Sequence, residues 1–259
     1  MQMIKQIFLY FVFLAIFLVN LSSQEVVTGL QSNYSITKNR AKQEINKGIA
    51  ASDTLDLQMF DDFSGQSVFH DKKMWLDDYV FINNTYSDRQ ITLGVATFDA
   101  LNDKGMLYET ASSSGFKADQ LTSKPINLNY PASQNIFLSF FYQAGGLSDP
   151  PEPNDSLTLQ FLAPVEQIWY SLWKMGGSTD QRFKPVIIPV NQTRFLKKGF
   201  QFRVINYASL SQNLRDPSMV GNSESWNMDY VLLTKNRNAA DTGVTGVTFT
   251  RQDRSLLKR

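Results

Sequence analysis

The feature that most constrains the fold is the lack of a helical apolar stripe between Leu57 and Leu233. Over this stretch short β-like runs alternate with clusters of Gly, Pro, Asn and Asp. In Phe200–Val204 apolar and polar side chains alternate, as in a half-buried antiparallel strand. Ile136–Tyr142 is apolar on nearly both faces, which is typical of a central strand. The pattern predicts an all-β protein, a two-sheet antiparallel β-sandwich with one core.

The flanking segments differ in texture from this stretch. Residues 1–24 join Lys5, the apolar run Ile7–Val19 and a short polar tail. That is the pattern of a secretory signal peptide, with an apolar run shorter than the roughly 20 residues of a membrane-spanning helix. We expect cleavage after Ser23 or Gln24, the alternative being an uncleaved anchor. The mature protein is then exported to the periplasm, cell surface or extracellular space, with no transmembrane span left after cleavage.

Three further regions follow the signal peptide. Residues 25–56 are polar and mixed in charge, which predicts a leader or linker with room for one helical turn. Residues 57–235 form the β-sandwich domain, and residues 236–259 form a C-terminal extension. Leu256 and Leu257 lie almost at the end of the chain, so we expect the native polypeptide to continue beyond Arg259.

Composition excludes several classes of function. The chain has no cysteine, so thiolate zinc sites, disulfides and cysteine nucleophiles are excluded. Its single histidine excludes a multi-histidine metal site. With 25 Lys+Arg against 24 Asp+Glu, no strong positive field exists to attract nucleic acid. An exported chain without disulfides is held together by packing, with or without the help of a metal ion.

The order of several short motifs resembles MAM domains and the wider concanavalin-A-like jelly rolls, over roughly residues 57–235. The motifs are Asp61–Phe63, Trp75, Gly94–Asp99, Leu121–Leu128, Phe137–Tyr142, Trp173 with Gly176–Gly177, Phe200–Arg203 and Trp226–Val231. The chain departs from the MAM pattern in lacking its cysteines and in having Phe183 where a second Trp is expected. Its style also resembles modules of exported Bacteroidota surface proteins, including those linked to type IX secretion and gliding.

The resemblance implies a cation site. Jelly rolls bring the first and last strands side by side, so Asp61 or Asp62 is expected to approach Asp229. Carboxylates held together repel each other unless a cation neutralises them, and Ca²⁺ accepts oxygen ligands in flexible geometry. Related jelly rolls often carry a cation at this junction, so the resemblance makes these aspartates candidates for a structural Ca²⁺ site, although the interpretation without a metal is favoured. The alternative is that these aspartates cap turns or lie exposed.

Two further sets of residues are candidates for ligand binding. Trp169 and Trp173 lie four apart in an expected strand and hence on one face, where an exposed pair would stack on a sugar ring; filling the core is the favoured alternative. Two long loops, residues 143–155 and 209–225, are candidates for partner contact. Asp149, Glu152 and Asp155 give the first loop an acidic face, and a solvated connection is the alternative.

Catalytic constellations are poorly represented. His70 is the only imidazole and has no Gly-x-Ser-x-Gly elbow, so we interpret it as a solvated loop residue. The paired acids of concanavalin-A-like glycosidases are absent as a local motif, and Glu109, Glu166 and Glu224 are isolated in sequence.

The sequence therefore predicts an exported, non-catalytic β-sandwich module for surface attachment or assembly, which binds a protein or a glycan. One alternative is a carbohydrate-binding module or glycoside-active enzyme of the concanavalin-A-like group. Another is a structural subunit of an outer-membrane secretion or gliding apparatus. The identity of the ligand and the oligomeric state stay open.

Overall fold

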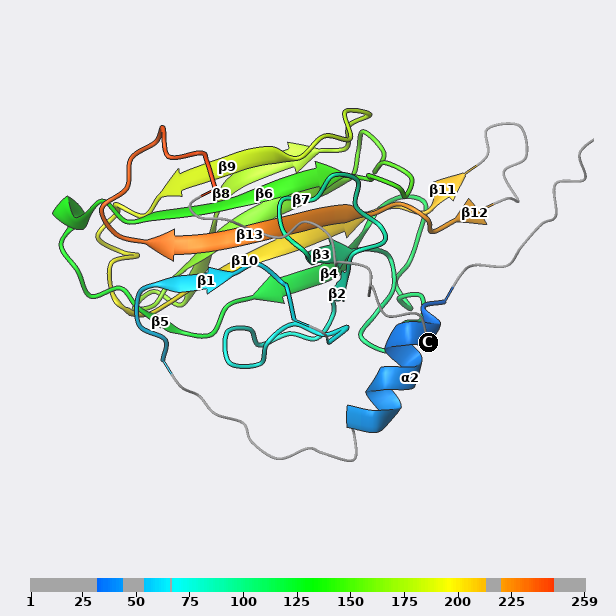
Figure 1. The fold of residues 1–259 in the computed structure, drawn as a ribbon, viewed down its shortest axis with the longest axis horizontal. Coiled ribbons are helices and arrows are strands. Elements are labelled where there is room, and N and C mark those ends of the chain that lie inside the picture. Colours follow the sequence, from blue (N-terminus) through cyan, green and yellow to red (C-terminus); the bar gives the residue numbers. More distant parts are fainter. Residues whose placement is uncertain (1–31, 44–53, 66, 213–219, 245–259) are drawn as a thin grey trace, which may run out of the picture.

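Two antiparallel β-sheets packed face to face form the body of the protein, as predicted (Figure 1). The computed structural model describes residues 32–43, 54–65, 67–212 and 220–244. Sheet I has the strand order β2-β3-β13-β6-β9, with β1 also paired to β13. Sheet II has the order β4-β10-β7-β8, with β5 also paired to β10. A short ribbon, β11–β12, stands apart from both sheets at one end of the sandwich.

The elements have the following bounds. Sheet I contains β1 (Met59–Asp61), β2 (Phe81–Asn83), β3 (Val95–Phe98), β6 (Phe137–Ala144), β9 (Lys184–Pro189) and β13 (Trp226–Thr234). Sheet II contains β4 (Phe116–Thr122), β5 (Ile126–Asn127), β7 (Ser156–Ala163), β8 (Ile168–Gly176) and β10 (Lys198–Ala208). The ribbon joins β11 (Ser211–Gln212) to β12 (Val220–Gly221). One α-helix, α2 (Tyr34–Gln43), and a single 3₁₀ turn, η2 (Ala132–Gln134), complete the elements described.

The core lies between the sheets and follows the alternation seen in the sequence. Phe200, Phe202 and Val204 of β10 are all buried in one apolar cluster, together with Leu159 and Phe161 of β7. The polar residues between them point to the other side of sheet II. Period-2 alternation thus predicted which side chains of these strands enter the core.

Strand β6 occupies the central position that its two apolar faces indicated, between β13 and β9. The first and last strands of the sandwich are neighbours, with Asp61 of β1 opposite Val231 of β13. Trp75 and Trp226 are each 1% exposed, which places both indoles in the core.

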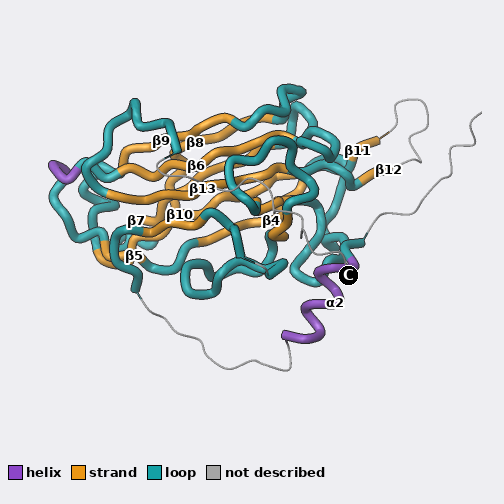
Figure 2. The backbone as a smooth tube through the Cα atoms, viewed as in Figure 1, coloured by secondary structure: helices purple, strands orange, loops and turns teal. Residues whose placement is uncertain are grey.

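Residues 25–56 contain more structure than the sequence indicated. The single helical turn expected there is a ten-residue helix, Tyr34–Gln43. Asn33 begins it by accepting a hydrogen bond from the backbone N of Ile36 through its side-chain oxygen, at 3.2 Å. Figure 2 shows α2 outside the two sheets, against the loops at one end of the sandwich.

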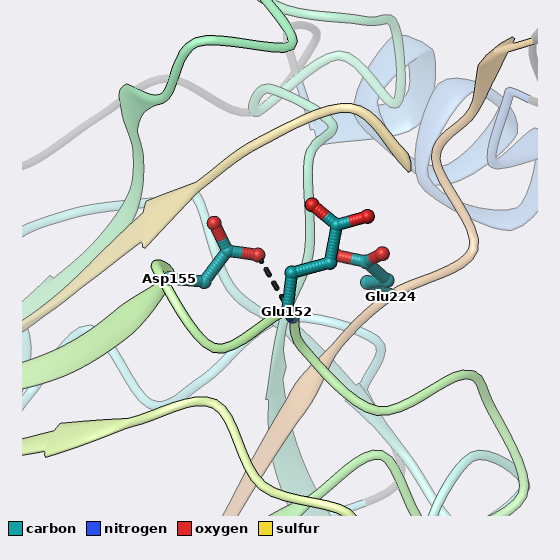
Figure 3. Close-up of side chains that lie close together, drawn as sticks. All are labelled: Glu152, Asp155 and Glu224. Carbon is teal, nitrogen blue, oxygen red and sulfur yellow. Dashed lines mark hydrogen bonds between the residues drawn. The ribbon is translucent and has the colours of Figure 1, made fainter. Parts of the chain in front are cut away.

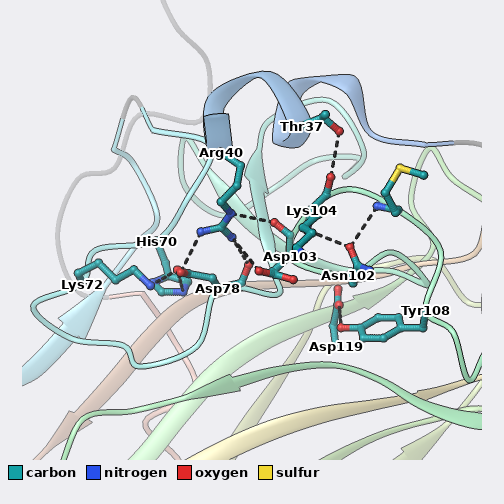
Figure 4. Close-up of polar contacts among 11 residues, drawn as sticks. Thr37, Arg40, His70, Lys72, Asp78, Asn102, Asp103, Lys104, Tyr108 and Asp119 are labelled. Carbon is teal, nitrogen blue, oxygen red and sulfur yellow. Dashed lines mark hydrogen bonds and ion pairs between the residues drawn. The ribbon is translucent and has the colours of Figure 1, made fainter. Parts of the chain in front are cut away.

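Contacts of α2 with the loops of the sandwich, and not an apolar periodicity of its own, explain why this segment is helical. Ile36 is buried in a small cluster with Phe69 and Phe81. Arg40 lies with its guanidinium 4.4 Å from the centroid of the Phe69 ring and forms an ion pair of 2.9 Å with Asp78 (Figure 4). A short helix with so little apolar surface of its own depends on such tertiary contacts.

Two predicted regions fall largely outside the described residues. They are the signal peptide, residues 1–24, and the C-terminal extension from residue 245 onward. Within the residues that are described, no helix combines the length and the apolar character needed to cross a bilayer.

Candidate functional site

The aspartates predicted to bind a cation are each engaged by protein donors. Asp61 accepts hydrogen bonds from the Trp75 indole, at 2.7 Å, and from the backbone N of Phe63, at 2.9 Å. Burial raises the pKa of Asp61, and these two hydrogen bonds oppose that rise. Asp62 accepts a hydrogen bond of 3.1 Å from the backbone N of Ser64. Asp62 therefore acts within the turn that follows β1, and Asp61 joins that turn to Trp75.

Asp229 fastens strand β13 to the segment before β3. Its carboxylate accepts hydrogen bonds from the backbone N of Ile91, at 2.9 Å, the backbone N of Thr92, at 2.8 Å, and the Thr92 hydroxyl, at 2.6 Å. Burial raises the pKa of Asp229 to about 7, although these hydrogen bonds lower it. Asp61, Asp62 and Asp229 do not form a group of three ligand atoms within 4.8 Å of one another. Their contacts match the turn-capping alternative, and a cation at this junction stays a prediction.

The two candidate tryptophans do not share a face. The adjacent residues Gln160 and Leu159 of β7 pair with Ser171 and Trp173 of β8, so β8 contains one extra residue between its two partners. This β-bulge turns Trp173 inward, where its ring lies 5.6 Å from that of Phe140. Trp169 remains on the outward side. The inference that both rings lie on one face was wrong because period-2 and period-4 arguments fail across a bulge. The favoured interpretation, a place in the core, applies to Trp173 and not to Trp169.

Trp169 forms part of a connected set on the outward side of sheet II. The Arg203 guanidinium lies over the Trp169 ring, 4.1 Å from its centroid. Its Nε donates a hydrogen bond of 2.8 Å to Gln160 Oε1, and Gln160 Nε2 donates one of 3.1 Å to Ser171 Oγ. Strands β10, β7 and β8 thus supply an aromatic ring, a cation, an amide and a hydroxyl in one row.

The same side continues onto β4. Tyr207 of β10 is 38% exposed and stands opposite Lys117 of β4 in the register. Beside them a cavity of about 170 Å³ is lined by Tyr79, Tyr108, Lys117, Ala118 and Gln120. We call the surface made by outward side chains of sheet II the outer face. The outward side chains that concern binding are those of Lys117, Gln120, Gln160, Trp169, Ser171, Arg203 and Tyr207, and Lys174 of β8, opposite Thr158 of β7, also lies on this side.

Charge on the outer face is unbalanced. Partial burial, and then the charge of Arg203, lower the pKa of Lys117, and partial burial lowers that of Arg203. Asp77 is the nearby carboxylate that favours both cations, and burial raises its pKa. Within the described residues, neither Lys117 nor Arg203 has a carboxylate oxygen within the 4.0 Å of an ion pair.

The two long loops meet at a second polar site. Glu152 and Asp155 lie in the first loop and Glu224 in the second, and each places a carboxylate oxygen within 4.8 Å of the others (Figure 3). Asp149 and Glu224 form an isolated parallel bridge that joins the loops. Among the described residues, this is the group of His, Asp and Glu side chains that is arranged to hold a metal ion. Residues 213–219 of the second loop lie outside the described part.

Two members of this acidic group, Glu224 and Asp155, have raised pKa values, which favours the neutral form and so weakens the repulsion between the carboxyl groups. Burial, and then a hydrogen bond with Asp155, raise the pKa of Glu224 to about 8. Burial raises the pKa of Asp155, whose Oδ1 lies 2.6 Å from the Ser209 hydroxyl. Glu224 is isolated in sequence and was not predicted as a member of a site. Only the pairing of the loops brings it to Glu152 and Asp155, so no local motif signals it.

His70 is not the solvated residue that was expected. It is 5% exposed, and neither ring nitrogen has a hydrogen-bond partner in the described part of the chain. Its Nε2 lies 3.8 Å from Asp78 Oδ1, beneath the contact that docks α2 (Figure 4). Burial lowers the pKa of His70 to about 4. The environment indicates a neutral, packed imidazole.

No protein-family model matches the chain, and no curated protein matches it. Solved structures show partial similarity, and they include glycoside hydrolases and carbohydrate-binding modules. The arabinose-bound MgGH51 α-L-arabinofuranosidase aligns at 11% identity and a TM-score of 0.36, over 62% of this chain and 22% of that chain.

Two further structures are similar to the same degree. The CBM22-1–GH10 modules of Clostridium thermocellum xylanase 10B, complexed with xylohexaose, align at 8% identity and a TM-score of 0.34, over 66% of this chain and 27% of that chain. The mannan-recognising module TmCBM27 aligns at 8% identity and a TM-score of 0.35, over 69% of this chain and 96% of that chain. The chain thus spans less than a third of the first two proteins and nearly all of the third. Similarity at this level does not establish a function.

Proposed function

We propose that the protein is an exported, non-catalytic β-sandwich module that binds a glycan through the outer face of sheet II and so acts in attachment at the cell surface. The observation that carries the proposal is the row formed by Trp169, Arg203, Gln160 and Ser171. Sugars present hydroxyl groups at their edges and apolar C–H groups on their faces. A surface that binds them needs amide, hydroxyl and cationic donors beside aromatic rings.

The outer face supplies both kinds of group. Ser171 and Tyr207 are exposed, and Gln160, Trp169 and Arg203 are half-buried. Because Arg203 covers the Trp169 ring, Tyr207 is the aromatic side chain best placed to stack on a sugar, and Trp169 holds the arginine in position. The side chains sit on strands of the core sheet, so little entropy is lost in ordering them on binding.

Export rests on the sequence of residues 1–24. N-terminal sequencing of the protein from its own cells checks this part, and we expect the mature chain to begin at Gln24 or Glu25. Recovery from the periplasm, cell surface or medium is the expected location. A mature protein that retains Met1 in the cytoplasm would contradict this part of the proposal.

Affinity gel electrophoresis against a panel of soluble polysaccharides tests glycan binding. We expect at least one polysaccharide to retard the wild-type protein and Tyr207→Ala to weaken that retardation about tenfold, the usual size for loss of one stacked ring plus its contacts. Phe60→Ala is the matched control, because Phe60 is an aromatic of similar exposure, 39%, on sheet I.

Three outcomes contradict the proposal. One is that no polysaccharide in the panel retards the wild type. Another is that Phe60→Ala weakens retardation as much as Tyr207→Ala does. The third is the release of reducing ends from a bound polysaccharide, which would show hydrolysis and contradict the non-catalytic part.

A further inference from the structure

Two cations of the outer face, Arg203 and Lys117, have no carboxylate oxygen of a described residue at ion-pair distance, although Asp77 lies near enough to favour both. Among the other described arginines, Arg40, Arg89, Arg182 and Arg194 each form an ion pair with an aspartate or glutamate, whereas Arg237 and several exposed lysines do not. Arg203 and Lys117 stand on adjacent strands, β10 and β4, and partial burial, followed by the charge of Arg203, lowers the pKa of Lys117, while Asp77 opposes that shift. An anionic ligand would be attracted by both cations, and a neutral glycan would not.

Arg203 is also held in one orientation. The Trp169 ring supports the plane of its guanidinium, and Gln160 accepts the hydrogen bond of its Nε. Gln160 is fixed in turn by its own hydrogen bond to Ser171. The two terminal nitrogens, Nη1 and Nη2, make no hydrogen bond to a described residue. A guanidinium oriented in this way presents two parallel N–H donors, the geometry that binds a carboxylate in bidentate fashion.

From these observations we infer that the ligand of the outer face is an acidic glycan, and that Arg203 binds the carboxylate of a uronic acid residue while Lys117 supplies a second positive charge. The inference rests on the proposed function and names the class of glycan. Asp77 partly offsets the positive charge of the surface. Recognition therefore also uses hydrogen bonds to the neighbouring hydroxyl groups of the sugar, and not charge alone.

Polygalacturonate and fully methyl-esterified polygalacturonan form a matched pair of probes, since they differ only in the charge of the carboxyl group. Dextran sulfate tests whether any polyanion is sufficient. We expect the wild-type protein to bind polygalacturonate at least tenfold more tightly than the esterified polymer or dextran sulfate. Binding should weaken as salt is raised, because part of the contact is ionic.

Substitutions of Arg203 separate the effect of its two parallel N–H donors, the guanidinium fork, from the effect of its positive charge. Arg203→Gln should weaken polygalacturonate binding tenfold or more, and Arg203→Lys should recover only part of the loss because lysine keeps the charge without the fork. Arg194→Gln is the control, because Arg194 also lies over an aromatic ring, that of Tyr170, but is paired with Glu166. Urea unfolding midpoints are measured for all three variants, and the Arg203→Lys comparison holds even if Arg203→Gln is destabilised.

The failures of the two proposals are distinguishable. If the wild type binds neutral polysaccharides through Tyr207 but does not prefer polygalacturonate, glycan binding stands and the acidic-ligand inference is overturned. Equal binding of the charged and esterified polymers, a preference for dextran sulfate, or equal effects of Arg203→Lys and Arg194→Gln also overturn it. If no polysaccharide binds, the proposed function itself fails.

Discussion

Asp229 offers the most direct test of how this fold is held together. Its buried carboxylate accepts three hydrogen bonds that join the last strand to residues 91 and 92. Asp229→Ala removes all three, at roughly 1–1.5 kcal/mol each, so we expect a loss of about 3–4 kcal/mol in the free energy of unfolding. Asp62→Ala, which removes one hydrogen bond at a more exposed turn, should cost about 1 kcal/mol or less and serves as the control.

Asp229→Asn separates hydrogen bonding from charge. In this variant the amide oxygen can keep the two backbone hydrogen bonds while the amide NH₂ donates to the Thr92 hydroxyl oxygen, which leaves the single hydrogen of that hydroxyl to be donated to the Asp62 carbonyl. The pKa of Asp229 is raised from 3.8 to about 7, so the folded state binds a proton that the unfolded state releases. This contribution is complete below the unfolded pKa and is lost as the pH rises through about 7. The wild type therefore loses about 2 kcal/mol of its free energy of unfolding between about pH 5.5 and pH 8 through this group, and the asparagine variant does not show that loss.

Urea unfolding at both pH values, with calcium and with a chelator, is the assay. We expect the alanine variant to be the least stable in every buffer, and the gap between wild type and Asp229→Asn to be larger at the lower pH. A cost below about 1 kcal/mol for Asp229→Ala would refute the hydrogen-bond reasoning. Equal losses for Ala and Asn that appear only when calcium is present would mean that a cation, and not capping, makes Asp229 important.

The other predictions concern the loop junction, the docked helix and the bulge. Because the pKa of Glu224 is raised to about 8, wild-type stability should fall as the pH rises through that value, and Glu224→Gln should flatten this slope in thermal melts; an unchanged slope would contradict the assignment. Ile36→Ala should cost about 2–4 kcal/mol and expose α2 to limited proteolysis, whereas equal protease resistance would mean that the helix is not held by this contact. Trp173→Ala should lower the free energy of unfolding by about 3–5 kcal/mol and Trp169→Ala clearly less. The reverse order in urea melts would mean that Trp169, and not Trp173, packs against the core.

Local patterns sufficed for the strands and the sandwich. Alternation in residues 200–204 predicted the inward Phe200, Phe202 and Val204, and the two-sided apolar run of residues 136–142 predicted the central position of β6. Such patterns are readable because a strand has a fixed period of two and a buried face excludes polar groups. The adjacency of the first and last strands came from the resemblance to jelly rolls, not from any local pattern.

The sequence by itself determined the class of the fold, the apolar interior and the absence of any cysteine chemistry. Only the tertiary structure decided where the functional side chains stand. One extra residue in β8 sends Trp173 inward and leaves Trp169 outside, the pairing of two loops brings Glu224 to Glu152 and Asp155, and docking stabilises α2. These outcomes depend on contacts between residues far apart in the chain, and the free energy of such contacts leaves no periodic trace in the segments that make them.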